Sequence, residues 1–188
     1  ATLEGLKIIR ALISDGINVN ATLIFSNERY RQVINAYLSG LEDRLNKGLP
    51  IDRIMSVASF FVSRIDSVID PLLEGKAEQS KGKIAIANAK LAYQLYLSEF
   101  SSERFDILER KGANHQKPLW ASTSTKNPNF PDTIYVDNLI ARNSVNTIPP
   151  KTLEAFLDHG VAELTIENDL NEAKTEMAAL AYFGIDFA

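Results

Sequence analysis

Hydrophobic residues recur along this chain with two different periods that alternate from segment to segment. Apolar residues return every three or four positions, as in amphipathic helices, over residues 2–15, 26–45, 84–97 and 167–183. Short apolar runs predict strands at residues 18–25, 54–62, 119–122 and 145–148. Shorter helical patterns fall at residues 67–73, 103–111, 135–140 and 150–159. Strands that are each followed by a helix favour parallel βαβ units with right-handed crossovers.

Glycine, proline and serine mark several ends of these elements. Gly16 is placed to close the first helix, and Ser26 is a suitable N-cap for the second. Pro71 is expected to interrupt the short helix at residues 67–73. The polar segment 74–82 is expected to be an exposed loop.

Alternation along the first strand divides its side chains into two sets. One set is Asn18, Asn20, Thr22 and Ile24, and the other, expected to face the outer helices, is Val19, Ala21, Leu23 and Phe25. In a barrel, Asn20 and Thr22 would then point inward at the carboxyl end of the strand, where barrel enzymes place their chemistry. The pattern alone favours the alternative, in which these polar groups only satisfy nearby backbone.

Composition limits the classes of fold and function. The chain has 188 residues, 45% apolar and 23% charged, which predicts one globular domain over residues 1–188. A net charge of −4 argues against a nucleic-acid partner, and the chain lacks both cysteine and an apolar run of membrane-spanning length. These features predict a cytoplasmic protein without disulfides, and no motif calls for a metal or a cofactor. Four strand–helix units leave two folds open: an open doubly wound sheet, or half of a (β/α)8 barrel, which needs about 250 residues.

Two places carry candidate anion-binding chemistry. The third strand ends in hydroxyl residues 122–125 followed by Lys126, which is typical of a phosphate pocket and also of ordinary turn chemistry. Arg64 follows the second strand and offers a planar fork to a phosphate. Its alternative roles are an ion pair with Asp66 or a helix cap.

Three motifs then identify a family. The segments GINVNATLIFS at 16–26, SFFVSRI at 59–65 and LWASTSTKNP at 119–128 resemble transaldolase, and the resemblance runs along the whole chain. It implies an α/β fold of the parallel (β/α)8 TIM-barrel type, of which about four β/α units are present as the C-terminal half. It also implies transfer of a dihydroxyacetone unit in the pentose phosphate pathway through a lysine Schiff base. That lysine would stand just before Ala1.

The resemblance also implies roles for individual residues. Asn20 corresponds to the asparagine that binds the dihydroxyacetone part of the substrate, and Thr22 to the threonine that holds the catalytic water. Arg64 and Ser122 correspond to the phosphate ligands, while Ser59 and Phe61 line the substrate channel. Many transaldolases have an arginine two residues after the phosphate-binding serine, but Ser124 stands there in this chain. The second phosphate contact is therefore expected from Ser124 or Lys126.

The implied partners are sugar phosphates: fructose 6-phosphate, sedoheptulose 7-phosphate, erythrose 4-phosphate and glyceraldehyde 3-phosphate. An isolated half-barrel leaves two sheet edges open, which predicts self-association or pairing with the N-terminal half. Two alternatives remain. The chain is a non-catalytic half-barrel that binds sugar phosphate, or it is an autonomous Schiff-base aldolase that uses Lys126.

Overall fold

The computed structural model describes residues 1–187 and contains a parallel four-stranded sheet in the order β1-β2-β3-β4. The strands are β1 Val19–Ile24, β2 Ser56–Phe61, β3 Gln116–Ala121 and β4 Val145–Asn146. The helices are α1 Leu3–Ser14, α2 Asn27–Asn46, α3 Ser63–Leu73, α4 Ile84–Phe100, α5 Glu103–Glu109, α6 Ile134–Asp137, α7 Pro150–His159 and α8 Leu170–Tyr182, with a 3₁₀ turn at Glu78–Ser80. This order confirms the expected parallel βαβ units. Within residues 1–187, no helix combines the length and the apolar character needed to cross a membrane.

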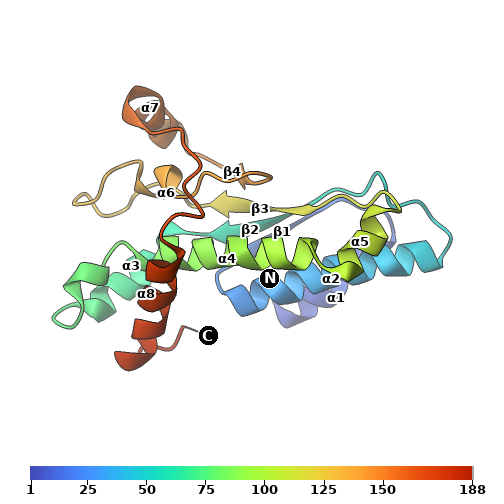
Figure 1. Cartoon of the computed structure of the whole chain (residues 1–188), viewed down its shortest axis with the longest axis horizontal. Coiled ribbons are helices and arrows are strands. Elements are labelled where there is room, and N and C mark those ends of the chain that lie inside the picture. Colours follow the sequence, from blue (N-terminus) through green and yellow to red (C-terminus); the bar gives the residue numbers. More distant parts are fainter. Residues whose placement is uncertain (188) are drawn as a thin grey trace.

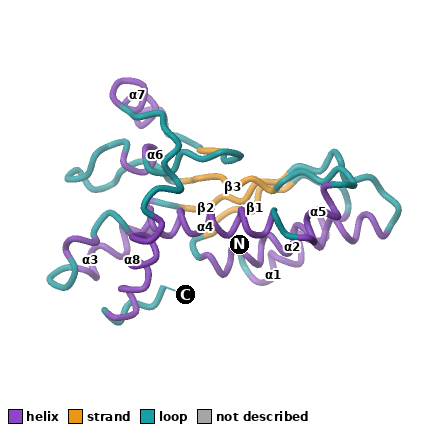
Figure 2. Tube along the Cα trace, viewed as in Figure 1, coloured by secondary structure: helices purple, strands orange, loops and turns teal. Residues whose placement is uncertain are grey.

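The long helices cover one face of the sheet. Helices α1, α2 and α4 run along that face, whereas α7 stands apart from them (Figure 1). Figure 2 shows the strands as one narrow band beside these helices. The core lies between the two layers, where the Phe60 ring contacts Tyr30 of α2 at 5.9 Å and Trp120 of β3 at 6.2 Å between centroids. Burial of these large rings away from water holds the helix layer on the sheet.

The first two helices begin and end where the sequence indicates. The Ser26 hydroxyl accepts a hydrogen bond from the Arg29 backbone N–H at 3.3 Å, which confirms Ser26 as the N-cap of α2. Gly16 has φ of +89°, a left-handed conformation that glycine adopts without strain, and it follows the last turn of α1. Together these signals fix both ends of β1.

The alternation expected for β1 is wrong at its carboxyl end. The pairing register with β2 shifts between Ala21 and Ile24, and Leu23 has φ of +59°. A bulge of this kind inserts one residue and reverses the faces of those that follow. As a result Ile24 is fully buried against the helices, while the Leu23 side chain, expected there, is 49% exposed.

Two expectations about the region after β2 are also wrong. Helix α3 begins at Ser63 rather than residue 67, and it continues through Pro71 to Leu73. Pro71 lies in the last turn on the exposed side, where the loss of one backbone hydrogen bond costs little. Segment 74–82 is not a wholly exposed loop, because Ala77 and Ser80 are buried around the 3₁₀ turn.

A buried carboxylate joins α3 to α4 and α6. Asp66 accepts hydrogen bonds from the Ala85 backbone N–H at 2.8 Å and from the Tyr135 hydroxyl at 2.8 Å. Only 2% of Asp66 is exposed, and desolvation raises the pKa of its carboxyl to about 7 despite these two donors. The start of α4 is therefore held by a group that titrates near neutral pH.

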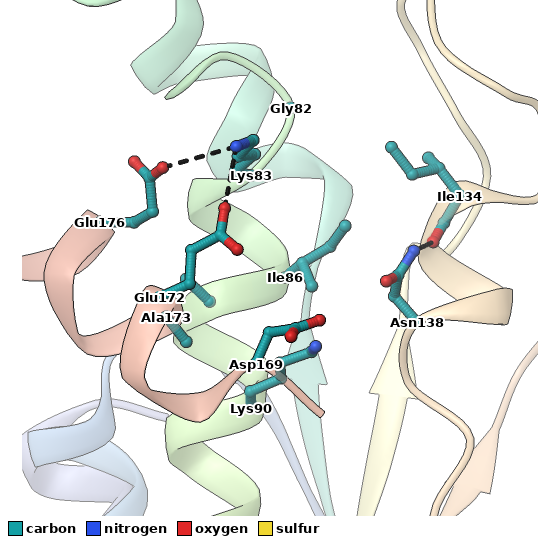
Figure 3. Close-up of a pocket in the computed structure, with 11 residues that line it drawn as sticks. Gly82, Lys83, Ile86, Lys90, Ile134, Asn138, Asp169, Glu172, Ala173 and Glu176 are labelled. Carbon is teal, nitrogen blue, oxygen red and sulfur yellow. Dashed lines mark hydrogen bonds and ion pairs between the residues drawn. The ribbon is translucent and has the colours of Figure 1, made fainter. Parts of the chain in front are cut away.

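Charged side chains dock α8 onto α4 at a cavity of about 230 Å³ (Figure 3). Lys83 forms ion pairs with Glu172 at 2.9 Å and with Glu176 at 3.7 Å. Lys90 is buried and donates to the backbone carbonyl of Asn168 at 2.8 Å. Because both lysines bond to the segment that contains α8, we assign this cavity to helix docking rather than to a ligand.

Candidate functional site

Two polar residues meet on the sheet face opposite the helix layer. Phe60 points into the helix layer, so its neighbours Ser59 and Phe61 point to the other face. There the Ser59 hydroxyl donates to Asn20 Oδ1 at 2.7 Å. This bond occupies the amide oxygen and leaves the Asn20 NH₂ group on the exposed side of the strand. An exposed residue of β1 and a buried residue of β2 are thus joined on the face opposite the helix layer.

The chain start lies at the carboxyl end of β1, beside the other candidate on this strand. The α-ammonium of Ala1 donates to the backbone carbonyls of Thr22 at 2.6 Å and Leu23 at 2.8 Å. The Thr22 residue itself is exposed. A segment joined to the amino side of Ala1 would therefore run next to the Thr22 end of β1.

Ser122 follows β3 and is held by a residue that the sequence analysis missed. Its backbone has φ of +57°, and its hydroxyl lies 3.0 Å from the Ser63 hydroxyl, with either able to donate. The Ser63 backbone N–H also donates to the Ser122 carbonyl at 2.9 Å. Ser63 is fully buried at the first turn of α3. The only sequence signal for Ser63 was its position directly before Arg64. Nothing in its sequence neighbourhood indicates a contact with Ser122, which lies 59 residues away.

Arg64 lies over the ring of Phe61, with 5.1 Å between the guanidinium carbon and the ring centroid. The Phe61 ring in turn contacts Phe25 at 5.4 Å. The alternative role of Arg64, an ion pair with Asp66, is wrong. The Asp66 oxygens accept from Ala85 and Tyr135 instead. Arg64 directly follows Ser63, which contacts Ser122. Both phosphate candidates therefore lie at the carboxyl ends of the strands.

The residues proposed for the second phosphate contact pair with each other. Lys126 donates to the Ser124 hydroxyl at 2.6 Å, and Lys126 is exposed. A lysine nucleophile needs desolvation or a cationic neighbour, and this environment supplies neither in an evident form. The exposure of Lys126 therefore does not favour an autonomous Schiff-base aldolase.

Thr123 is a second residue of this edge that sequence reasoning did not single out. It is fully buried, and its hydroxyl donates to Asn146 Oδ1 at 2.8 Å. This bond joins the carboxyl ends of β3 and β4 directly after Ser122. Each hydroxyl in the run 122–125 has a protein partner, since Ser124 accepts from Lys126 and Thr125 donates to the backbone carbonyls of Pro131 and Asp132.

Comparison with known proteins finds relatives that match the whole of this sequence. Residues 1–188 match the family model described as Transaldolase/Fructose-6-phosphate aldolase. The chain is 50% identical to a transaldolase of Arthrobacter sp. (strain FB24) over 192 residues, covering 100% of this chain and 52% of the relative. It is also 50% identical to a transaldolase of Acidothermus cellulolyticus, covering 100% of this chain and 51% of that protein. Transaldolase 2 of Streptomyces avermitilis is 46% identical, with 100% and 52% covered. The chain spans about half the length of these curated relatives.

Proposed function

Because this chain belongs to the transaldolase/fructose-6-phosphate aldolase family, we propose that residues 1–188 are the single-domain C-terminal half of a transaldolase barrel. The whole protein then transfers a dihydroxyacetone unit between sugar phosphates through a lysine Schiff base. The observation that carries this proposal is the contact of Ala1 with the carboxyl end of β1. A strand that precedes Ala1 would end beside Thr22, where its lysine could meet the substrate held by this chain.

In the proposed reaction, the lysine amine attacks the ketone of the donor and water leaves, giving a protonated imine. The bond between C3 and C4 then breaks as the C4 hydroxyl loses its proton, and the electron pair enters the imine to form an enamine. The aldose product departs, the enamine carbon attacks the aldehyde of the acceptor, and water releases the new ketose. The imine is the electron sink, so the reaction needs no metal or redox partner.

This chain would orient the substrate during those steps. Asn20 donates its amide N–H to a hydroxyl of the dihydroxyacetone unit, because Ser59 already occupies the amide oxygen. Thr22 holds the water that moves protons, and Phe61 lines the channel. Arg64 and Ser122 bind the phosphate, with Ser124 or Lys126 as a further contact. We propose fructose 6-phosphate and sedoheptulose 7-phosphate as donors, erythrose 4-phosphate and glyceraldehyde 3-phosphate as acceptors, and the cytoplasm as the location.

Replacing Arg64 with Ala tests the phosphate site. The variant is expected to bind fructose 6-phosphate more weakly by about 1.5–3 kcal/mol, the worth of a charged hydrogen bond. Isothermal titration calorimetry at fixed salt measures the difference. The matched control is Arg53→Ala, which removes an exposed arginine before the amino end of β2. Equal affinities for wild type and Arg64→Ala would reject Arg64 as a phosphate ligand.

Borohydride trapping tests the division of chemistry between the two halves. Reduction in the presence of fructose 6-phosphate converts an imine into a stable amine, which mass spectrometry detects on one peptide. The 188-residue chain alone is expected to remain unlabelled, and labelling is expected on an N-terminal fragment once the two associate through the open edges of β1 and β4.

Two other results of this experiment would contradict the proposal. Labelling of Lys126 in the isolated chain would favour the alternative that the chain is an autonomous aldolase. Failure to label any lysine in the associated halves, with sugar phosphate bound, would leave the non-catalytic half-barrel as the better interpretation. Size-exclusion chromatography of the isolated chain tests self-association separately.

A further inference from the structure

We propose that Arg29 is a second guanidinium ligand of the anion that Arg64 binds, and that this site selects a doubly charged phosphate monoester. The inference rests on the proposed phosphate site at Arg64, and adds a residue of α2 to it. Neither the three motifs nor the helical pattern of residues 26–45 distinguishes Arg29 from a surface residue.

Arg29 and Arg64 line the same cleft, which has a volume of about 570 Å³. Its apolar walls include Phe25 and Val68, and Asp186 also lines it. Two arginines and one aspartate therefore line one partly apolar cleft. That balance of charge favours an added anion over an added cation.

One nitrogen of Arg29 lacks a partner within the described part of the chain. Nη1 of Arg29 is buried and makes no hydrogen bond with residues 1–187. A buried charged donor that loses its water without gaining an acceptor lowers stability, so such groups call for an explanation. A phosphate oxygen in the cleft would supply the missing acceptor.

The two arginines occupy similar positions after neighbouring strands. Arg29 follows the N-cap Ser26 of α2 by three residues, and Arg64 follows the N-cap Val62 of α3 by two. Because β1 and β2 are parallel neighbours, both helices start at the same edge of the sheet. Burial and the charge of Arg29 lower the pKa of the Ala1 amino group, which also places Arg29 near the carboxyl end of β1.

The two guanidinium forks together match the charge of the proposed ligand. A phosphate monoester carries up to two negative charges and three terminal oxygens, enough for a fork from each side. A carboxylate has one charge and two oxygens, and would satisfy only one arginine. Arg29 therefore determines preference for phosphate over carboxylate more than it determines binding itself.

Phosphate titration of five variants of the full-length protein tests this assignment. Inorganic phosphate is the probe, acetate is the comparison ligand, and calorimetry gives the dissociation constants. Arg29→Met is expected to weaken phosphate binding about tenfold and acetate binding less. Arg64→Met is expected to weaken both. Arg31→Met is the matched control. Arg31, also on α2, pairs with Glu99 of α4, so its loss should leave phosphate binding unchanged.

Thermal unfolding separates a ligand role from a structural one. Arg29→Met keeps an unbranched apolar stem and removes the buried donor, so its unfolding midpoint without phosphate should equal or exceed that of wild type. A lower midpoint with unchanged phosphate affinity would overturn the inference. Arg29→Lys, which keeps the charge and loses the fork, should recover part of the affinity, and no recovery would also count against it.

A double variant shows whether the arginines share one anion. If both bind the same phosphate, Arg29→Met/Arg64→Met should lose less affinity than the product of the two single losses. Losses that multiply would mean separate ions and would overturn the inference. A loss in Arg64→Met but not in Arg29→Met would reject Arg29 and leave the proposed function intact. No loss in either would reject the phosphate site of the proposed function itself.

Discussion

Replacing Trp120 with Ala is expected to lower the free energy of unfolding by about 3–5 kcal/mol, a large part of the about 5–15 kcal/mol that a domain has in total. Trp120 is 1% exposed and packs edge-on against Phe60, which is fully buried beneath Tyr30. Truncation would leave a cavity between the sheet and the helix layer, beneath the strand that precedes Ser122. Urea unfolding followed by far-ultraviolet circular dichroism measures the change, since Trp120 is the only tryptophan and its fluorescence is lost.

Two further variants control for this result. Trp120→Phe keeps an aromatic ring and removes a buried indole N–H that has no partner in the described residues. It should therefore lower the free energy of unfolding much less than Trp120→Ala does. Leu157→Ala changes a side chain of α7 that is 76% exposed, and it should stay within about 0.5 kcal/mol of wild type. A Trp120→Ala protein as stable as Leu157→Ala would mean that the ring cluster does not hold the sheet to its helices.

Replacing Asp66 with Asn is expected to stabilise the protein at pH 8 and to have little effect at pH 4. The pKa of the carboxyl is about 7 in the folded protein, above its value in the unfolded chain. The folded state therefore holds an extra proton between about pH 4 and pH 7, so wild-type stability falls as the pH rises through that window. The integrated loss from this one group is about 4 kcal/mol.

The amide preserves the local hydrogen bonds without the charge. Asn at position 66 can accept from the Ala85 N–H and donate to the Tyr135 oxygen. Urea unfolding of both proteins at pH 4 and pH 8 gives the comparison, with exposed Asp52→Asn as the control. An Asp66→Asn protein less stable than wild type at pH 8 would show that the ionised carboxylate stabilises this junction.

Much of the sheet was predictable from the sequence because local patterns determine it. Strand and helix periods, the Gly16 end and the Ser26 cap are properties of short segments. Alternation also put Asn20 on the face away from the outer helices, and the structure shows that its partner there is Ser59. The extent of the barrel did not follow from periodicity, and the assignment to half a barrel came from the family motifs.

The failures share a physical cause, which is that tertiary contacts determined the local structure. The bulge that exposes Leu23 and buries Ile24 is a matter of how β1 pairs with β2. Ser63 contacts a residue far away in sequence. The Arg29 nitrogen that has no partner among residues 1–187 can be recognised only when the surroundings of α2 are in place. Neither residue differs from an ordinary polar residue in its sequence neighbourhood.

The ion pairs that dock α8 make this helix a salt-sensitive part of the fold. Lys83 pairs with Glu172 at 2.9 Å and with Glu176 at 3.7 Å, and the Lys83 and Glu172 side chains are 47% and 55% exposed. Added salt screens exposed ion pairs, so the contact between α8 and α4 weakens as the ionic strength rises. A buffer of low ionic strength therefore holds α8 on α4 more firmly than a concentrated salt solution does.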